Sequence, residues 1–143
     1  MRKYIFIGLG GFFGAIVRYL IELMQIQGYQ VAVPLNTLTI NIAGSFILAF
    51  ILTFALEVRE VNPDIRLGLT MGFLGAFTTF SALCKETVGL LQNGDYFFAI
   101  SYITISIILG LGLAYVGIVL ARKAGLKLIN SKENITEIES EVE

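Results

Sequence analysis

The chain has 143 residues, of which 56% are hydrophobic and 15% are charged, and it contains neither His nor Trp. This composition is too apolar for an ordinary soluble domain of this length and indicates a membrane protein. The net charge of -1 argues against nucleic acid as a partner, and the lack of His argues against a Cys/His metal cluster and against an enzyme.

Four apolar segments are long enough to cross a bilayer, whose hydrocarbon core takes about 20 helical residues. They cover about residues 4–24, 35–56, 67–91 and 96–120, and the second and fourth contain no charged residue. We therefore predict an all-α membrane protein whose four transmembrane helices form one domain over residues 1–121.

The first segment follows Arg2-Lys3 and so resembles a signal peptide, but no small-residue cleavage site follows it. We interpret it as a retained helix. Arg18 lies inside this helix, where a charge costs about 2.5–3.5 kcal/mol at the bilayer centre. Arg18 is either a snorkelling anchor or a vestibule residue that attracts anions. The spacing of Gly10 and Gly14 predicts close packing against another helix.

The second segment carries Thr37, Asn41 and Ser45 at a spacing of four residues, which places them on one face of a helix. Hydroxyl groups on such a face either line a pore or bond to carbonyls of their own helix. Asn41 differs because its amide cannot satisfy both donors and its acceptor on its own helix. We predict that Asn41 faces a pore or a helix interface.

The third segment contains Gly68, Gly72 and Gly75, followed by the run Thr-Thr-Phe-Ser at residues 78–81. Gly and Thr at this density weaken a helix, which predicts a break at mid-membrane. Carbonyls freed by a break are tolerated at membrane depth only where protein or an ion covers them, and a hard cation such as Na⁺ takes oxygen ligands. The alternative is an unbroken helix that packs through its small residues.

Further polar residues lie in the last two segments. Lys85 and Glu86 are adjacent in the third segment and point about 100° apart on a helix, so we do not expect them to pair. In the fourth segment Tyr102 and Ser106 repeat the spacing of four, with Gly110 next in line. The chain therefore carries two polar stripes, one on the second segment and one on the fourth.

The charges predict how the chain sits in the membrane. An even number of helices puts both termini and the central loop on one side, and eight of the ten basic residues fall there: Arg2, Lys3, Arg59, Arg66, Arg122, Lys123, Lys127 and Lys132. The positive-inside rule predicts that this side is the cytoplasm. Residues 122–143 are polar, with acidic residues at helical spacing, and we expect a solvated, partly disordered cytoplasmic tail.

Three stretches occur in order on the first three predicted helices: GGFFGAIVRY at residues 10–19, TLTINIAGSF at 37–46 and GFLGAFTTFS at 72–81. Together they resemble the small bacterial fluoride channels (FluC, also called CrcB), and the resemblance spans roughly residues 5–120. It implies a fluoride-selective ion channel that passively exports fluoride from the cytoplasm and so relieves fluoride toxicity.

The same resemblance implies two chains packed antiparallel across the bacterial inner membrane, with two fluoride pores along their interface and one structural Na⁺ at its centre. The backbone carbonyls of Gly75 and Thr78 would hold this ion. The pore positions that match the family are Asn41, Phe80, Tyr102 and Ser106. Thr37, on the same helix face as Asn41, is a further pore candidate, and Arg18 is the candidate vestibule residue.

Two features depart from the family pattern. Leu83 stands where the family has a second pore phenylalanine, and it lacks a polarised ring edge for fluoride. The one-sided basic charge predicts a single direction of insertion, whereas a homodimer of opposed chains needs both. The partner is therefore either a second copy or a related, oppositely inserted chain that supplies the missing phenylalanine.

Two other functions remain open. A small multidrug-type exporter also has four helices and an antiparallel dimer, but its proton coupling needs a carboxylate deep in the first helix. Here Glu22 lies at the end of that helix instead. A non-transporting membrane assembly subunit would use the polar stripes only to hold helices together.

Overall fold

The computed structural model describes residues 1–24, 34–58 and 61–142, with side chains as far as residue 127. Helices account for all the regular structure in these residues. Four of the helical stretches are long and apolar enough to cross a membrane: Arg2–Leu23, Leu35–Val58, Pro63–Gln92 and Tyr96–Lys127. The prediction of an all-α protein with four membrane-spanning segments is therefore confirmed.

The first two segments are helices α1 (Arg2–Leu23) and α2 (Leu35–Thr53), and α2 runs on into a π-helical turn, η1 (Phe54–Val58). The third segment consists of α3 (Pro63–Leu67), the π-helical η2 (Gly68–Leu74), α4 (Gly75–Phe77) and α5 (Phe80–Gln92). The fourth is α6 (Tyr96–Val142).

Local sequence signals explain two of the boundaries. The Asn62 side chain accepts a hydrogen bond of 2.9 Å from the Asp64 N–H, and Pro63 occupies the first helical position, where its missing N–H costs nothing. At the other end of the third segment, Gly94 adopts a φ of 82°, a conformation that glycine reaches without strain. The chain thereby turns tightly between the third and fourth segments.

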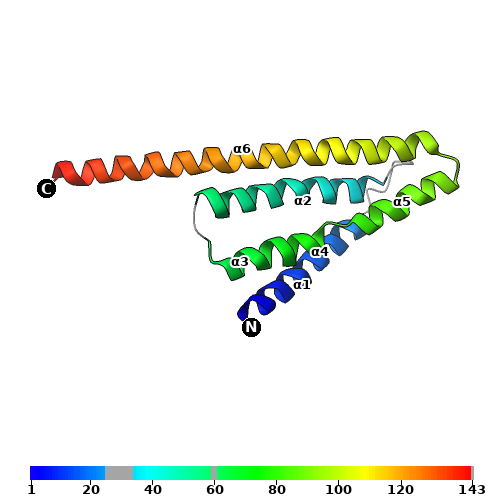
Figure 1. Ribbon diagram of the computed structural model, residues 1–143, viewed down its shortest axis with the longest axis horizontal. Coiled ribbons are helices and arrows are strands. Elements are labelled where there is room, and N and C mark those ends of the chain that lie inside the picture. Colours follow the sequence, from blue (N-terminus) through cyan, green and yellow to red (C-terminus); the bar gives the residue numbers. More distant parts are fainter. Residues whose placement is uncertain (25–33, 59–60, 143) are drawn as a thin grey trace.

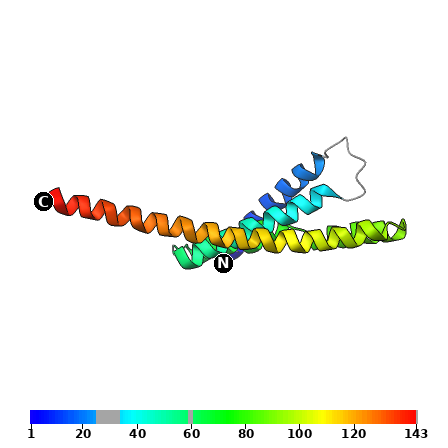
Figure 2. The ribbon, with the colours of Figure 1, turned by 90° about the horizontal axis from the view of Figure 1, so that it is seen from above.

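The helices pack as two pairs, and α2 of the first pair also contacts the second (Figure 1). One pair is α2 with α6, which run side by side, and the other is α1 crossing η2 and α4. Seen from above, α6 extends well beyond the other helices toward the C-terminus (Figure 2). It is one helix to Val142, longer than the segment that the sequence predicted. The cytoplasmic location of residues 122–143, and the partial disorder expected of them, stay predictions.

Glycines set the distance between α1 and the third segment. A Cβ added at Gly10 would overlap the Gly68 carbonyl, and one added at Gly14 would overlap the Phe73 carbonyl. A Cβ at Gly72 would lie 2.5 Å from the Ile7 carbonyl oxygen. Only hydrogen atoms fit between these backbones, so the predicted role of the glycine spacings in helix packing is confirmed.

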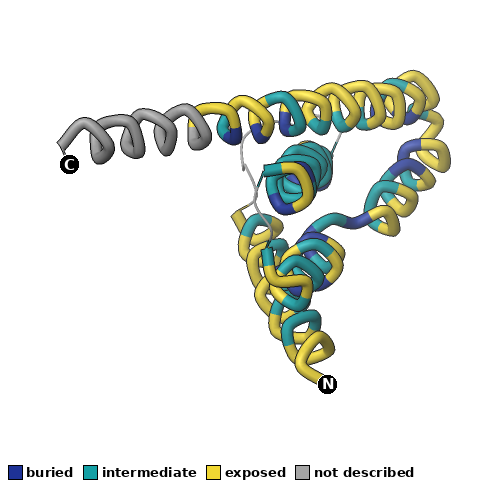
Figure 3. The backbone as a smooth tube through the Cα atoms, turned by 60° about the vertical axis from the view of Figure 1, so that its left-hand side comes forward, coloured by how far each residue is buried: buried dark blue, intermediate teal, exposed yellow. Residues whose placement is uncertain are grey.

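The buried core is small. One cluster comprises Ile40, Leu74 and Phe77, where α2 meets the third segment, and another joins Leu90 of α5 to Ala99 and Tyr102 of α6. Buried residues lie where helices face one another, whereas most of α1 and of the part of α6 up to residue 127 is exposed (Figure 3). Apolar side chains on these outer faces are suited to contact lipid or another membrane chain.

Candidate functional site

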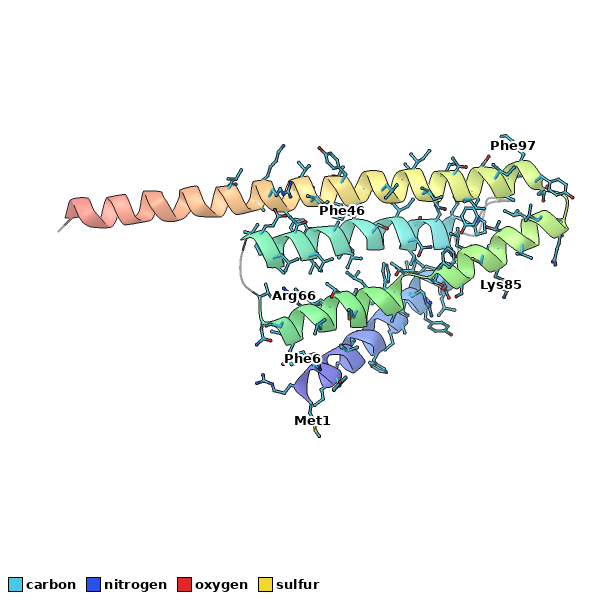
Figure 4. All side chains as sticks on the ribbon, viewed as in Figure 1. Met1, Phe6, Phe46, Arg66, Lys85 and Phe97 are labelled. Atoms are coloured by element: carbon cyan, nitrogen blue, oxygen red, sulfur yellow. The ribbon has the colours of Figure 1, made fainter. Side chains whose placement is uncertain are left out.

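The site forms where α2 passes the junction between α4 and α5 (Figure 4). At this junction Thr78 and Thr79 leave the helical conformation, with ψ of 153° at Thr78 and φ, ψ of -145° and 112° at Thr79. The helical backbone is thus interrupted for two residues. Thr79 is nearly buried, so its backbone N–H and C=O need partners from the protein.

Asn41 supplies both partners. Its Oδ1 accepts a hydrogen bond of 2.8 Å from the Thr79 N–H, and its Nδ2 donates one of 2.9 Å to the Thr79 carbonyl. The second N–H of Nδ2 remains available to another acceptor. The sequence predicted that this amide faces a pore or a helix interface. The two bonds place it at the interface of α2 with the third segment, while its pore role stays a prediction. The backbone partner was not predicted.

A hollow of about 230 Å³ opens beside this contact and is lined by Asn41, Gly44, Ser45, Leu48, Thr78, Thr79 and Phe80. It adjoins a larger groove of about 620 Å³ between α2 and α6, which shares Ser45 and Leu48 with it and also includes Ser106 and Gly110. The polar stripes of the second and fourth segments therefore border one open, mainly apolar surface.

Phe80 and Leu83 occupy different environments. Phe80 is the first residue of α5, lines the hollow and is 77% exposed, so its ring is free to contact something outside this chain. Leu83, one turn further along, packs against the cluster of Leu90, Ala99 and Tyr102. The structure therefore brings Phe80 to the hollow together with Asn41, and turns Leu83 toward α6.

Glu86 is a site residue that the sequence reasoning missed. Its two carboxylate oxygens accept hydrogen bonds from the Thr37 hydroxyl at 2.7 Å and from the Tyr102 hydroxyl at 2.6 Å. Thr37 is 4% exposed and Tyr102 is fully buried, and the half-buried Glu86 carboxylate joins α5 to both α2 and α6. The available signal was an acidic residue inside an apolar segment, which needs donors wherever it is buried.

The other predicted hydroxyls bond within their own helices. Ser45 donates to the Asn41 carbonyl at 2.8 Å, and Ser106 donates to the Tyr102 carbonyl at 2.7 Å. Such bonds are common for serines in membrane helices and leave the oxygen lone pairs available. Hydroxyl residues with the same spacing on a helix face thus form two kinds of hydrogen bond. The serines bond within their own helix, whereas Thr37 bonds to another helix.

Arg18 lies apart from both hollows. Its Nε is 3.7 Å from a carboxylate oxygen of Glu22, one turn along α1, in a pair whose side chains are 33% and 45% exposed. The same Nε is buried and has no hydrogen-bond partner among the described residues. The vestibule role of Arg18 stays a prediction.

Comparison with known proteins shows the family. The CrcB-like proteins, a family described as Camphor Resistance (CrcB), match residues 5–118. The chain belongs to this family. A relative from Sulfurihydrogenibium sp. (strain YO3AOP1) is 39% identical over 85% of this chain and 98% of its own length, and one from Hydrogenobaculum sp. (strain Y04AAS1) is 42% identical over 76% and 88%. Both are named fluoride-specific ion channel FluC.

A third relative of this CrcB-like chain, from Moorella thermoacetica, is 42% identical over 83% of the chain and 85% of its own length, and is named fluoride-specific ion channel FluC 1. These matches confirm the family resemblance that the three sequence stretches indicated. Each covers the region that contains the hollow, the interrupted helix and Glu86.

The interruption also bears on whether this CrcB-like chain can hold a cation. Among the described residues no group of three or more His, Cys, Asp or Glu side chains could hold a metal ion, so a site here would depend on backbone carbonyls. In a continuous helix the Gly75 carbonyl would accept from the Thr79 N–H and the Thr78 carbonyl from the Ala82 N–H.

Both donors bond elsewhere. The Thr79 N–H donates to Asn41, and the Ala82 N–H donates at 3.2 Å to Thr79 Oγ1, which caps α5. The two carbonyls predicted to bind Na⁺ are therefore those whose helical donors are taken by side chains. Gly75 is also exposed on this chain. Carbonyl oxygens are ligands that suit a hard cation.

Proposed function

We propose that this chain is a fluoride-selective channel that lets fluoride leave the cytoplasm passively and so relieves fluoride toxicity. The observation that carries the proposal is the similarity, over most of both chains, to relatives named fluoride-specific ion channels. Those names describe channels, in keeping with the prediction that this chain is no enzyme. An interior-negative potential of 100 mV would contribute about 2.3 kcal/mol to the outward movement of one anion.

The geometry of the hollow suits a small, strongly hydrated anion. A pore must replace the water of fluoride with donors, and the free N–H of Asn41 and the positive edge of the Phe80 ring both border the hollow. Among the described residues no Lys or Arg lines the hollow, so a bound anion would meet no fixed positive charge from them that retains it. Of the other residues assigned to the pore, Ser106 lines the adjoining groove between α2 and α6, whereas Thr37 and Tyr102 are buried and bond to Glu86.

The hollow is open on this chain, and we propose that an antiparallel partner closes it. Phe80 lines this hollow and is exposed, and an aromatic ring left this exposed gains from a partner surface that covers it. Two pores would then run along the dimer interface, with Na⁺ at its centre between the Gly75 and Thr78 carbonyls of both chains. The interruption at Thr78 and Thr79 would lie at mid-membrane.

Fluoride efflux from liposomes tests the proposal. Purified chain is reconstituted, and efflux of fluoride and of chloride is followed with ion-selective electrodes, with protein-free liposomes as the control. Detergent removes the constraint of insertion direction, so homodimers can form before reconstitution. We expect rapid fluoride efflux without chloride efflux. Silence after addition of an oppositely inserted family member would contradict the channel and favour a non-transporting subunit.

A further inference from the structure

Asn41 does more than line the hollow. One amide oxygen and one amide N–H bond to the two backbone groups of a single residue, Thr79. A side-chain amide offers the same donor and acceptor as a peptide group, so this contact resembles one pair of a β-ladder. The reverse amide orientation would set a donor against the Thr79 N–H, so the pairing itself fixes the orientation.

The rest of α2 holds Asn41 in position for this contact. Ile40, the preceding residue, is almost fully buried against Leu74 and Phe77. One turn further along, a Cβ added at Gly44 would overlap the Thr78 methyl group, so the glycine lets α2 approach the interrupted backbone. Packing and close approach therefore place the amide against Thr79 independently of any ion.

The bonds between Asn41 and Thr79 prevent the Thr79 N–H from forming the ordinary helical hydrogen bond. Thr79 is 6% exposed, so water is a poor substitute partner for its N–H. Without the Asn41 amide, the nearest acceptor along the chain is the Gly75 carbonyl, through the ordinary helical bond. That bond would close the interruption and would also occupy one of the two carbonyls assigned to the cation.

We propose that Asn41 is a positioning residue that keeps the third segment open at Thr78 and Thr79. By taking the Thr79 N–H it leaves the Gly75 carbonyl available to a cation. The second step rests on the sodium site of the proposed function, whereas the first rests only on the described contacts. Asn41 thus couples the pore wall to the ion site through one amide group.

Two measurements on the full-length protein test the two steps separately. With ¹³C-labelled threonine, the Cα and carbonyl chemical shifts of Thr78 and Thr79 report whether these residues are extended or helical. Thermal unfolding in detergent, with Na⁺ or with an equal concentration of N-methylglucamine, reports cation binding without any flux measurement. The variant is Asn41→Ala, with Asn41→Ser as a second substitution in case the first does not fold.

The matched control is Ser45→Ala, one turn along α2, whose hydroxyl lines the same hollow but bonds only to its own helix. We expect both Asn41 variants to move the Thr78 and Thr79 shifts toward helical values and to lose the rise in unfolding temperature with Na⁺. Ser45→Ala should keep the extended shifts and the Na⁺ effect.

Extended shifts that persist in the Asn41 variants would overturn the positioning role. Helical shifts with an intact Na⁺ effect would overturn the link between Asn41 and the cation. A wild-type protein that Na⁺ does not stabilise would overturn the sodium site of the proposed function and the second step here, while the threonine shifts would still decide the first. Loss of fluoride efflux alone would not distinguish these outcomes, because Asn41 also lines the hollow.

Discussion

Glu86 receives hydrogen bonds from two hydroxyls that belong to different helices, so it shows what one residue contributes to the fold. In a Glu86→Gln variant, one of the two oxygens becomes an NH₂ group that cannot accept from Thr37 or Tyr102. Bonds to charged groups contribute about 1.5–3 kcal/mol each. We expect Glu86→Gln to lower the free energy of unfolding by about 1–3 kcal/mol.

Thermal or denaturant unfolding in detergent measures this loss. Glu22→Gln is the matched control, because Glu22 is 45% exposed and lies 3.7 Å from its cation, in a pair of the kind that contributes about 0–1 kcal/mol. Equal effects of the two substitutions would contradict a stabilising role of the hydroxyl bonds to Glu86.

Phe80 is the residue whose exposure indicates function more than stability. We expect Phe80→Ile to reduce fluoride efflux by about two- to tenfold, because contacts of an aromatic ring edge contribute about 0.5–1.5 kcal/mol. Phe97→Ile is a control of equal exposure, at 78%, on a residue that lines neither hollow, and it should leave efflux unchanged.

At the scale of helices, the crossing of α1 with η2 and α4 depends on backbone contact. We predict that Gly14→Ala destabilises the protein by about 1–3 kcal/mol, because the new methyl group would meet the Phe73 carbonyl and force the helices apart. Gly8→Ala is the matched control on the same helix, since nothing lies within 4 Å of its added Cβ. Gly8→Ala should leave the free energy of unfolding in detergent unchanged or raise it. If Gly8→Ala lowered the stability as much as Gly14→Ala, the packing explanation would be contradicted.

The same scale shows what the sequence could predict. The length of the apolar segments predicted the four membrane segments, and the glycine spacing predicted the close helix crossing. Both predictions succeed because they depend on residues near one another in the chain. The sequence could not predict the hydrogen-bond partner of Thr37, because Glu86 is 49 residues away and the contact depends on how α2 and α5 pack. For the same reason Ser45 and Thr37, equally spaced from Asn41, could not be told apart in their hydrogen bonding.

For the whole molecule, the remaining question is how two chains oppose each other. Arg122 forms an ion pair with Glu57 through two hydrogen bonds, at 2.7 and 2.9 Å, which ties α6 to η1, the π-helical turn that follows α2. The excess of basic residues near both termini and in the central loop favours one direction of insertion over the other.

We therefore expect a reporter fused to the C-terminus to lie in the cytoplasm in nearly all copies of this chain. Fusions active only in the cytoplasm, or only outside it, measure the two populations. Neutralising Arg122, Lys123 and Lys127 together should bring a measurable fraction of C-termini to the outside, because the positive-inside bias weakens with each charge lost. A single direction in cells would mean that the opposed partner is a related chain, which Leu83 in place of a pore phenylalanine also favours. Equal populations of the two orientations would instead establish that one sequence can supply both halves of the dimer.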